Sequence, residues 1–202
     1  MSFSKELLTL KERVLDELAP SFRRIEQISE ENTLKVLTAM RECKVSDIHF
    51  NTSSGYAYDD IGRSKLEELY AKVFAAESAL VRTQFVSGTH ALATVLFGIL
   101  RPGDKLVSLT GTPYDTMQTV IGYTTSSSGS LKEYGILYDE LPLNEGRVDV
   151  ERIADVLDER TKMVLIQRSR GYSRRPTLLI EDIREICNQV HRLRPDCICF
   201  VD

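Results

Sequence analysis

The feature of this sequence that most constrains its fold is an alternation of short apolar runs with longer amphipathic stretches. The apolar runs span 105–109, 134–138, 163–166 and 197–201, and the amphipathic stretches between them span 116–121, 148–157 and 178–193. Strands that are apolar along most of their length are typical of a parallel sheet covered by helices on both faces. We therefore predict an α/β fold with a mainly parallel sheet and helices on both faces.

Polar turns follow several of these apolar runs. In a parallel α/β sheet, ligands bind beyond the carboxyl ends of the strands, where such turns meet. The sequence places four candidates at these ends, at 87–89, 112–115, 167–172 and 202. We expect them to converge on one site.

The segment 86–91 reads Val-Ser-Gly-Thr-His-Ala, between an apolar run at 79–81 and a helix-like run at 91–100. Small residues at a strand-to-helix turn let backbone amides face an anion, with the positive end of the helix dipole behind them. The segment has neither the Gly-Lys-Ser/Thr of a P-loop nor the three spaced glycines of a dinucleotide fingerprint. It is a candidate phosphate site, although Ser-Gly at a strand end is more often an ordinary turn.

Asp202 directly follows the apolar run at 197–201. A carboxylate opposite a pyridine-type nitrogen stabilises the protonated ring, which then acts as an electron sink. A phosphate site on another strand would hold the far end of the same cofactor, and an aromatic side chain such as Tyr114 would cover the ring. The alternative for a strand-end carboxylate is a helix cap or a loop residue.

The first 45 residues carry apolar side chains at helical spacing, and we predict two helices broken near Pro20. Their apolar stripes must be buried against the domain or against a second subunit, and both remain open. Residues 46–63 lack a sustained period and predict a long loop, either a binding loop or a surface connection. A helix with Ser64 as its candidate N-cap follows. We assign 1–45 to a helical segment and 46–202 to the α/β domain.

Composition and charge exclude several classes of function. The chain has 202 residues, a net charge of −4 and scattered Lys and Arg residues, so we expect one large globular domain with no nucleic-acid or membrane partner. It lacks an apolar run near the ~20 residues of a membrane span and an apolar signal core, which predicts a cytoplasmic protein. The four cysteines have no zinc-site spacing, so we expect no metal, and Cys197 and Cys199 should alternate onto one buried sheet face.

Four segments together resemble the aluminium-resistance proteins related to methionine γ-lyase and cystathionine β-lyase, which are pyridoxal 5′-phosphate (PLP) proteins of fold type I. These segments are 54–63, 87–91, 111–115 and 199–202. The resemblance implies that Ser87, Gly88 and Thr89 hold the phosphate of PLP. It also implies that Tyr114 stacks on the pyridine ring and that Asp202 pairs with the ring nitrogen, which gives these two residues the catalytic roles.

The same resemblance implies a contact between subunits. Tyr58 and Arg63 resemble the tyrosine and arginine that reach the phosphate of a neighbouring subunit's cofactor, which implies a homodimer or homotetramer. The wider lyase family brings that tyrosine and arginine closer together, so Tyr56 is an alternative to Tyr58. His90 stands where those lyases carry a small residue, and it either contacts the cofactor or packs.

The activity implied by the resemblance is β- or γ-elimination on a sulfur-containing amino acid. An aminotransferase-like enzyme and a PLP-binding stress-associated protein without turnover are the alternatives. The family's Schiff-base lysine lies beyond the aspartate strand, and the candidate substitutes lie outside the four segments, at Lys65, Lys72, Lys105, Lys132 and Lys162. We therefore expect the chain to be the N-terminal part of a longer enzyme.

Overall fold

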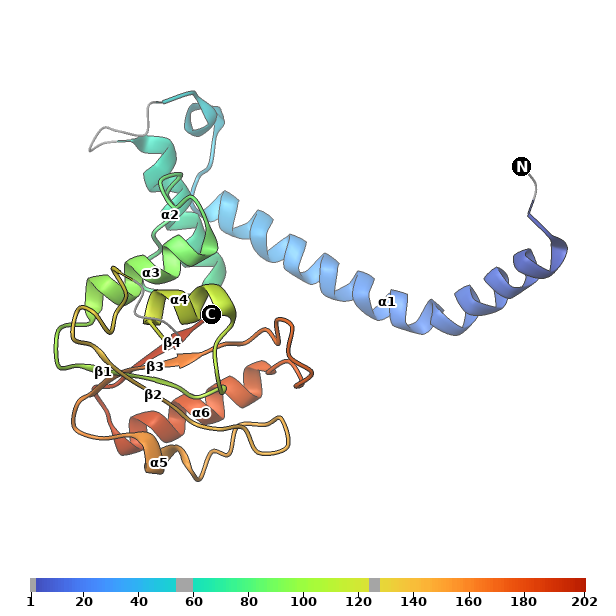
Figure 1. The fold of residues 1–202 in the computed structure, drawn as a ribbon. Helices are drawn as coiled ribbons and strands as arrows, with labels where there is room; N and C mark the ends of the chain where they lie inside the picture. Colours follow the sequence, from blue (N-terminus) through green and yellow to red (C-terminus); the bar gives the residue numbers. More distant parts are fainter. Residues whose placement is uncertain (1–2, 54–59, 124–127) are drawn as a thin grey trace. The chain divides into compact units, whose positions relative to one another are not determined.

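The computed structural model describes residues 3–53, 60–123 and 128–202 (Figure 1). The chain divides into two compact units, Met1–Gln84 and Phe85–Asp202. No helix in the described part of the chain has the length and apolarity needed to cross a bilayer. The assignment of residues 46–202 to one cofactor-binding domain stays a prediction.

The first unit begins with a single helix, α1, which spans Lys5–Glu42 (Figure 1). The prediction of two helices broken at Pro20 is wrong, because Pro20 lies inside α1. Proline removes one backbone hydrogen bond and bends a helix without having to end it when strong helix formers continue on both sides. Ser4 caps the helix by accepting a hydrogen bond from the Leu7 N–H at 3.3 Å. Within α1 only Ala39 is buried.

The remaining elements of this unit are a 3₁₀ helix, η1 (Asp47–Phe50), and helix α2 (Ile61–Phe74). The predicted loop over 46–63 is therefore shorter than expected, and Ser64 is not the N-cap of α2. Asp60 caps it instead, accepting the Arg63 N–H at 2.9 Å. Aspartate is as good a cap as serine, so the earlier start satisfies the helix N-terminus equally well.

The second unit is built on a four-stranded sheet in the order β2-β1-β3-β4, with every pair parallel. The strands are β1 (Lys105–Ser108), β2 (Leu137–Glu140), β3 (Thr161–Ile166) and β4 (Ile198–Val201). Each parallel crossover carries a helix, as parallel connections require. The predicted α/β class with a parallel sheet is confirmed.

Helices cover both faces of this sheet, as predicted. Helices α3 (Gly88–Ile99) and α4 (Asp115–Ile121) pack on one face, in a core with Leu106 and Leu165. Helices α5 (Ile153–Val156) and α6 (Ile180–Leu193) contribute to a second core with Val107 and Val164. Neighbouring strand residues alternate between the two cores, because successive side chains of a strand point to opposite faces.

Cys197 and Cys199 lie on the same side of the sheet, as expected. Cys197 is 3% exposed and belongs to the α6-side core, and Cys199 packs against that core while remaining partly exposed. Burial raises the pKa of the Cys197 thiol to about 11. Both side chains therefore act as small apolar groups on this face.

Three expected elements differ from the structure. The run 79–81 is not a strand, and the Val81 N–H donates to the Glu67 carboxylate at 3.0 Å instead of pairing with a neighbouring strand. Strand β2 starts at Leu137 because Gly135 turns the chain with φ of +81°. The helix expected over 148–157 is reduced to α5, since the preceding residues form successive turns. Each of these runs was too short for its periodicity to decide the outcome.

Candidate functional site

The N-terminus of α3 supplies an open anion site. Ser87 is the N-cap, and its Oγ accepts the His90 N–H at 3.1 Å. Among the described residues, no acceptor pairs with the backbone N–H of Gly88 or Thr89. Apart from the adjacent residues and the backbone of α3 itself, no atom lies within 4 Å of the position that a Cβ on Gly88 would take. Two free amides, open space and the positive helix end together suit an anionic group.

Tyr114 stands at the N-cap position of α4 and is partly buried. Burial raises the pKa of its phenol, and the negative charge of Asp202 raises it further. Hydrogen bonds of its side chain with Thr89 and Thr116 act in the opposite direction. Tyr114 therefore interacts with both Thr89 of α3 and Asp202, so three of the residues predicted from sequence come together.

Asp202 continues the ladder of the sheet beyond β4. Its N–H donates to the Ile166 carbonyl at 3.0 Å, and its carbonyl accepts the Arg168 N–H at 2.8 Å. Loss of hydration raises the pKa of the Asp202 carboxyl. No side chain among the described residues makes a hydrogen bond or ion pair with that carboxyl. A partly dehydrated carboxylate of this kind favours a cationic or N–H-bearing ligand.

A cleft of about 380 Å³ opens beside Tyr114. One wall is the turn 110–115 and the other includes Gln167 and residues 170–173. Buried Arg175 holds the second wall by donating to the carbonyls of Gln167 and Ser169, both at 2.7 Å. The two predicted turns at 112–115 and 167–172 therefore meet at the carboxyl edge of the sheet.

His90 and Arg168 have different surroundings. The His90 Nδ1 accepts the Val86 N–H at 3.4 Å, and its ring meets the Phe85 ring edge-on with centroids 5.9 Å apart. This geometry corresponds to the packing alternative. The backbone of Arg168 pairs with Asp202, while its side chain is exposed.

The residues predicted to reach a neighbouring subunit are described only in part. Tyr58 and its alternative Tyr56 lie outside the described residues. Arg63 lies in the first turn of α2 and lines a cleft of about 580 Å³ within the first unit, together with His49, Asn51 and other residues. The role of Arg63 toward a cofactor phosphate stays a prediction.

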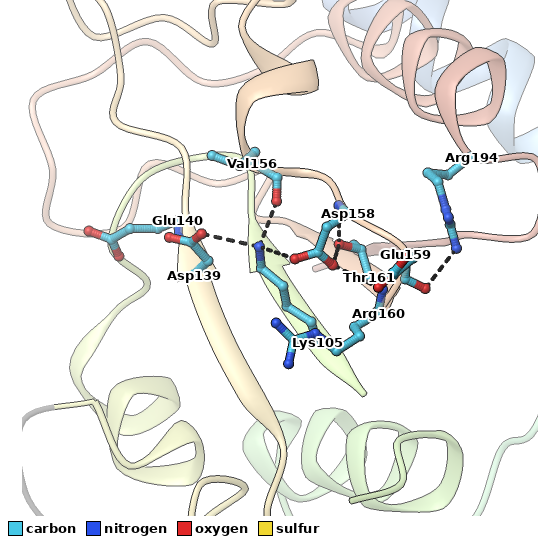
Figure 2. A network of polar contacts seen from close by, with 9 residues as sticks. All are labelled: Lys105, Asp139, Glu140, Val156, Asp158, Glu159, Arg160, Thr161 and Arg194. Carbon is cyan, nitrogen blue, oxygen red and sulfur yellow. Dashed lines mark hydrogen bonds and ion pairs between the residues drawn. The ribbon is translucent and has the colours of Figure 1, made fainter. Parts of the chain in front are cut away.

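Lys105 begins β1, at the amino edge of the sheet (Figure 2). Its Nζ donates to the Val156 carbonyl at 2.8 Å and pairs with Asp158 and Asp139, both at 3.2 Å. The side chain is 12% exposed. Lys105 is therefore a structural cation at the edge opposite Asp202.

The other four candidate lysines lie on α2, between α4 and β2, and on β3. Lys65 and Lys72 are on α2 and pair with Glu68 and Glu42. Lys132 lies over the Tyr123 ring, 6.0 Å from its centroid, and Lys162 is the second residue of β3. The expectation that none of them replaces the family's cofactor-binding lysine stays a prediction.

One polar residue of this edge was missed from the sequence. Glu140 ends β2, and its carboxylate accepts from the hydroxyls of Thr112 at 2.9 Å, Tyr138 at 3.0 Å and Tyr123 at 3.4 Å. The strand was predicted to end at residue 138, so Glu140 was not recognised as a strand-end residue. The available signal was its acidic side chain two residues after an apolar run.

With this geometry in view, comparison with known proteins gives the family. Residues 7–202 match the sequence profile named methionine gamma-lyase. The chain belongs to the methionine gamma-lyase family. YnbB of Bacillus subtilis is 46% identical over 188 residues, covering 92% of this chain and 45% of YnbB.

Two solved structures of this family are very similar. A carbon-sulfur lyase involved in aluminium resistance from Clostridium novyi is 48% identical with a TM-score of 0.91, covering 98% of this chain and 48% of that one. A Listeria innocua protein, described as a candidate cystathionine beta-lyase involved in aluminium resistance, is 47% identical with a TM-score of 0.94 over 98% of this chain and 49% of that one. The fold is that of fold type I PLP enzymes, and the chain spans about half the length of these relatives.

Proposed function

We propose that the whole protein is a PLP-dependent carbon–sulfur lyase that eliminates a sulfur leaving group from a small sulfur-containing amino acid. The observation that carries the proposal is that Tyr114 interacts with both the Asp202 carboxylate and Thr89, in the first turn of α3. Membership of the methionine gamma-lyase family and the carbon-sulfur lyase from C. novyi support it.

The chemical character of these groups fits the three parts of PLP. The backbone amides of Gly88 and Thr89 would bind its phosphate, because they are unpaired donors at a positive helix end. Tyr114 would cover its ring, and Asp202 would hold a proton at the ring nitrogen through a charge-assisted hydrogen bond. When bound, PLP supplies an electron-withdrawing ring that stabilises negative charge at the substrate Cα.

The protonation states of this chain's own groups follow from their surroundings. Burial and Asp202 raise the pKa of Tyr114, so its phenol stays protonated at neutral pH and is able to donate a proton. The pKa of the Asp202 carboxyl is raised by loss of hydration, and a cationic partner would lower it again. The site thus gains most from a ligand that carries a protonated nitrogen.

The experiment is an assay of the full-length protein, supplied with PLP, for the joint release of keto acid and of sulfide or thiol from L-cysteine, cystathionine and methionine. We expect release from at least one of these amino acids and a PLP absorption band in the visible region. A protein that stays colourless with PLP would contradict the cofactor assignment. A coloured protein that releases no sulfide or thiol, and instead passes the amino group to an added keto acid, would replace elimination with transamination.

A further inference from the structure

Glu140 is the centre of a hydroxyl cluster at the carboxyl end of β2. Its Oε1 accepts from Thr112 and more weakly from Tyr123, at 2.9 and 3.4 Å, and its Oε2 accepts from Tyr138 at 3.0 Å. The Glu140 side chain points away from the Lys105 network, whereas the Asp139 side chain points toward it (Figure 2). Its charge therefore interacts with neutral hydroxyl donors and not with a cation of that network.

The Thr112 hydroxyl links this cluster to the turn that precedes Tyr114. Side chains or backbone groups from elsewhere in the unit also hold the other residues of this turn. Gln167 N–H donates to the Thr110 hydroxyl at 3.1 Å, and Ser108 Oγ donates to the Gly111 carbonyl at 2.6 Å. Gln118 Nε2 donates to the Pro113 carbonyl at 2.6 Å. Each residue from 110 to 113 therefore has its own anchor.

Glu140 supplies the one charged anchor among these four. A hydrogen bond to a carboxylate is shorter and stronger than one between neutral groups. The two tyrosine hydroxyls bind the same carboxylate, and burial keeps Tyr138 protonated by raising its pKa well above the usual value. Tyr138 is therefore a permanent donor that holds Glu140 in the orientation that receives Thr112.

We propose that Glu140 is a positioning residue for Tyr114, acting through Thr112 and the turn 110–113. Only the expected effect on bound PLP rests on the proposed function, because the hydrogen bond from Thr112 to Glu140 lies within this chain. The role assigned to Glu140 requires no contact with the reacting atoms. It fixes the direction in which the Tyr114 ring leaves the turn, and so sets how the ring faces Thr89 and Asp202.

The test uses full-length protein without PLP, labelled with 3-fluorotyrosine, with the Tyr114 signal assigned by its loss in Tyr114→Phe. In the wild type, this signal should titrate at a higher pH than free 3-fluorotyrosine. Thr112→Val removes the hydroxyl at nearly constant volume, and Glu140→Ala removes the acceptor. In both variants the ionisation constant of the residue-114 phenol should rise at least threefold, and the double variant should equal Glu140→Ala alone.

Two control variants separate positioning from general destabilisation. Asp139→Ala removes the neighbouring carboxylate, which pairs with Lys105 on the other face, and should leave the Tyr114 titration unchanged. Glu140→Gln retains an oxygen acceptor for Thr112 and should restore most of the wild-type titration. An unchanged titration in Thr112→Val, or an equal change in Asp139→Ala, would overturn the proposal.

The consequence for the cofactor is measured separately by visible circular dichroism of the PLP-loaded proteins. Glu140→Ala should lose at least half of the PLP band intensity while PLP affinity changes less than threefold, because ring orientation and not phosphate binding is affected. If the wild type binds no PLP, the proposed function fails while the titration still decides the role of Glu140. If the wild type binds PLP and the Glu140 variants match it in both measurements, only this inference fails.

Discussion

At the scale of single residues, a substitution of Asp202 distinguishes a role in binding PLP from a role in its chemistry. Asp202→Asn keeps the shape of the side chain but removes the charge that would keep a ring nitrogen protonated. A charge-assisted hydrogen bond is worth about 1.5–3 kcal/mol, and ~3 kcal/mol lost only in the transition state is about a hundredfold in rate. We expect turnover to fall by up to that factor while PLP affinity falls much less. Elimination rates and PLP titrations of the full-length protein measure both, and a wild-type rate would make Asp202 an ordinary strand-end carboxylate.

The sequence predicted this grouping of residues because the rule that brings them together is simple. Parallel strands end at the same edge of a sheet, so polar residues placed after apolar runs meet there, as Tyr114 and Asp202 do. The same rule did not identify Glu140, because the strand was predicted to end at residue 138. Gly135 delays the start of β2, and the strand ends two residues later than predicted. The unpaired state of the Asp202 carboxyl also depends on three-dimensional neighbours, which sequence spacing does not specify.

At the scale of elements, α3 offers a matched pair of glycines. Gly88 lies at the free N-terminus of the helix and Gly98 near its end, and an added Cβ meets no atom within 4 Å at either position. Both Gly88→Leu and Gly98→Leu should fold, because leucine favours a helix over glycine by up to ~1 kcal/mol in its interior. Only Gly88→Leu should weaken PLP binding, by at least tenfold, since its side chain would obstruct the amides that face the phosphate. Equal PLP affinities in equilibrium titrations would contradict the anion site.

The Lys105 ion pairs at the amino edge of the sheet allow stability to be tested without altering the candidate site. Burial raises the pKa of Asp158, but hydrogen bonds from Lys105 and the Arg160 backbone outweigh it, so the net pKa is lowered. Lys105→Met should therefore cost ~1–2 kcal/mol of unfolding free energy at neutral pH, since both carboxylate partners keep some solvent.

The pH dependence of this loss follows from the sign of the Asp158 shift. A lowered folded-state pKa gives stability that is present above the unfolded pKa and is lost as pH falls through the folded value. The difference between wild type and Lys105→Met should thus shrink in acid, as urea unfolding at pH 7 and below pH 4 measures. Activity per folded molecule should stay unchanged, because Lys105 lies at the opposite edge from Asp202.

Element boundaries were predicted least well where the local signals compete. Pro20 predicted a helix end, but α1 continues through it. Ser64 and Asp60 are both good caps four residues apart, and the structure uses Asp60 with support from the Ser53 hydroxyl. The run at 79–81 was apolar enough for a strand, yet Val81 bonds to a side chain of α2. In each case a tertiary or local partner decided between two locally acceptable choices.

At the scale of the whole molecule, the class of fold was predictable from the sequence. The surface that buries the apolar side chains of α1 was not. Alternating apolar runs and amphipathic stretches specify a parallel sheet with helices on both faces, since few other arrangements bury both patterns. The apolar side chains of α1 require a partner, but their pattern does not say which one. Leu8, Leu15, Phe22 and Ile25 are 45%, 45%, 45% and 60% exposed.

We expect α1 to be covered by a second copy in the full-length protein, which should sediment as at least a dimer. Residues 8, 15 and 22 lie on one face at 100° per residue, and Leu10 lies about 120–160° away from them around the helix. Leu15→Glu combined with Phe22→Glu should dissociate the oligomer, because two charges would enter an apolar contact. Leu10→Glu, equally exposed at 45%, should leave the sedimentation coefficient unchanged. A wild-type monomer with full PLP affinity would show that no second copy is needed, and an intact oligomer in the double variant would mean that α1 is covered from within its own chain.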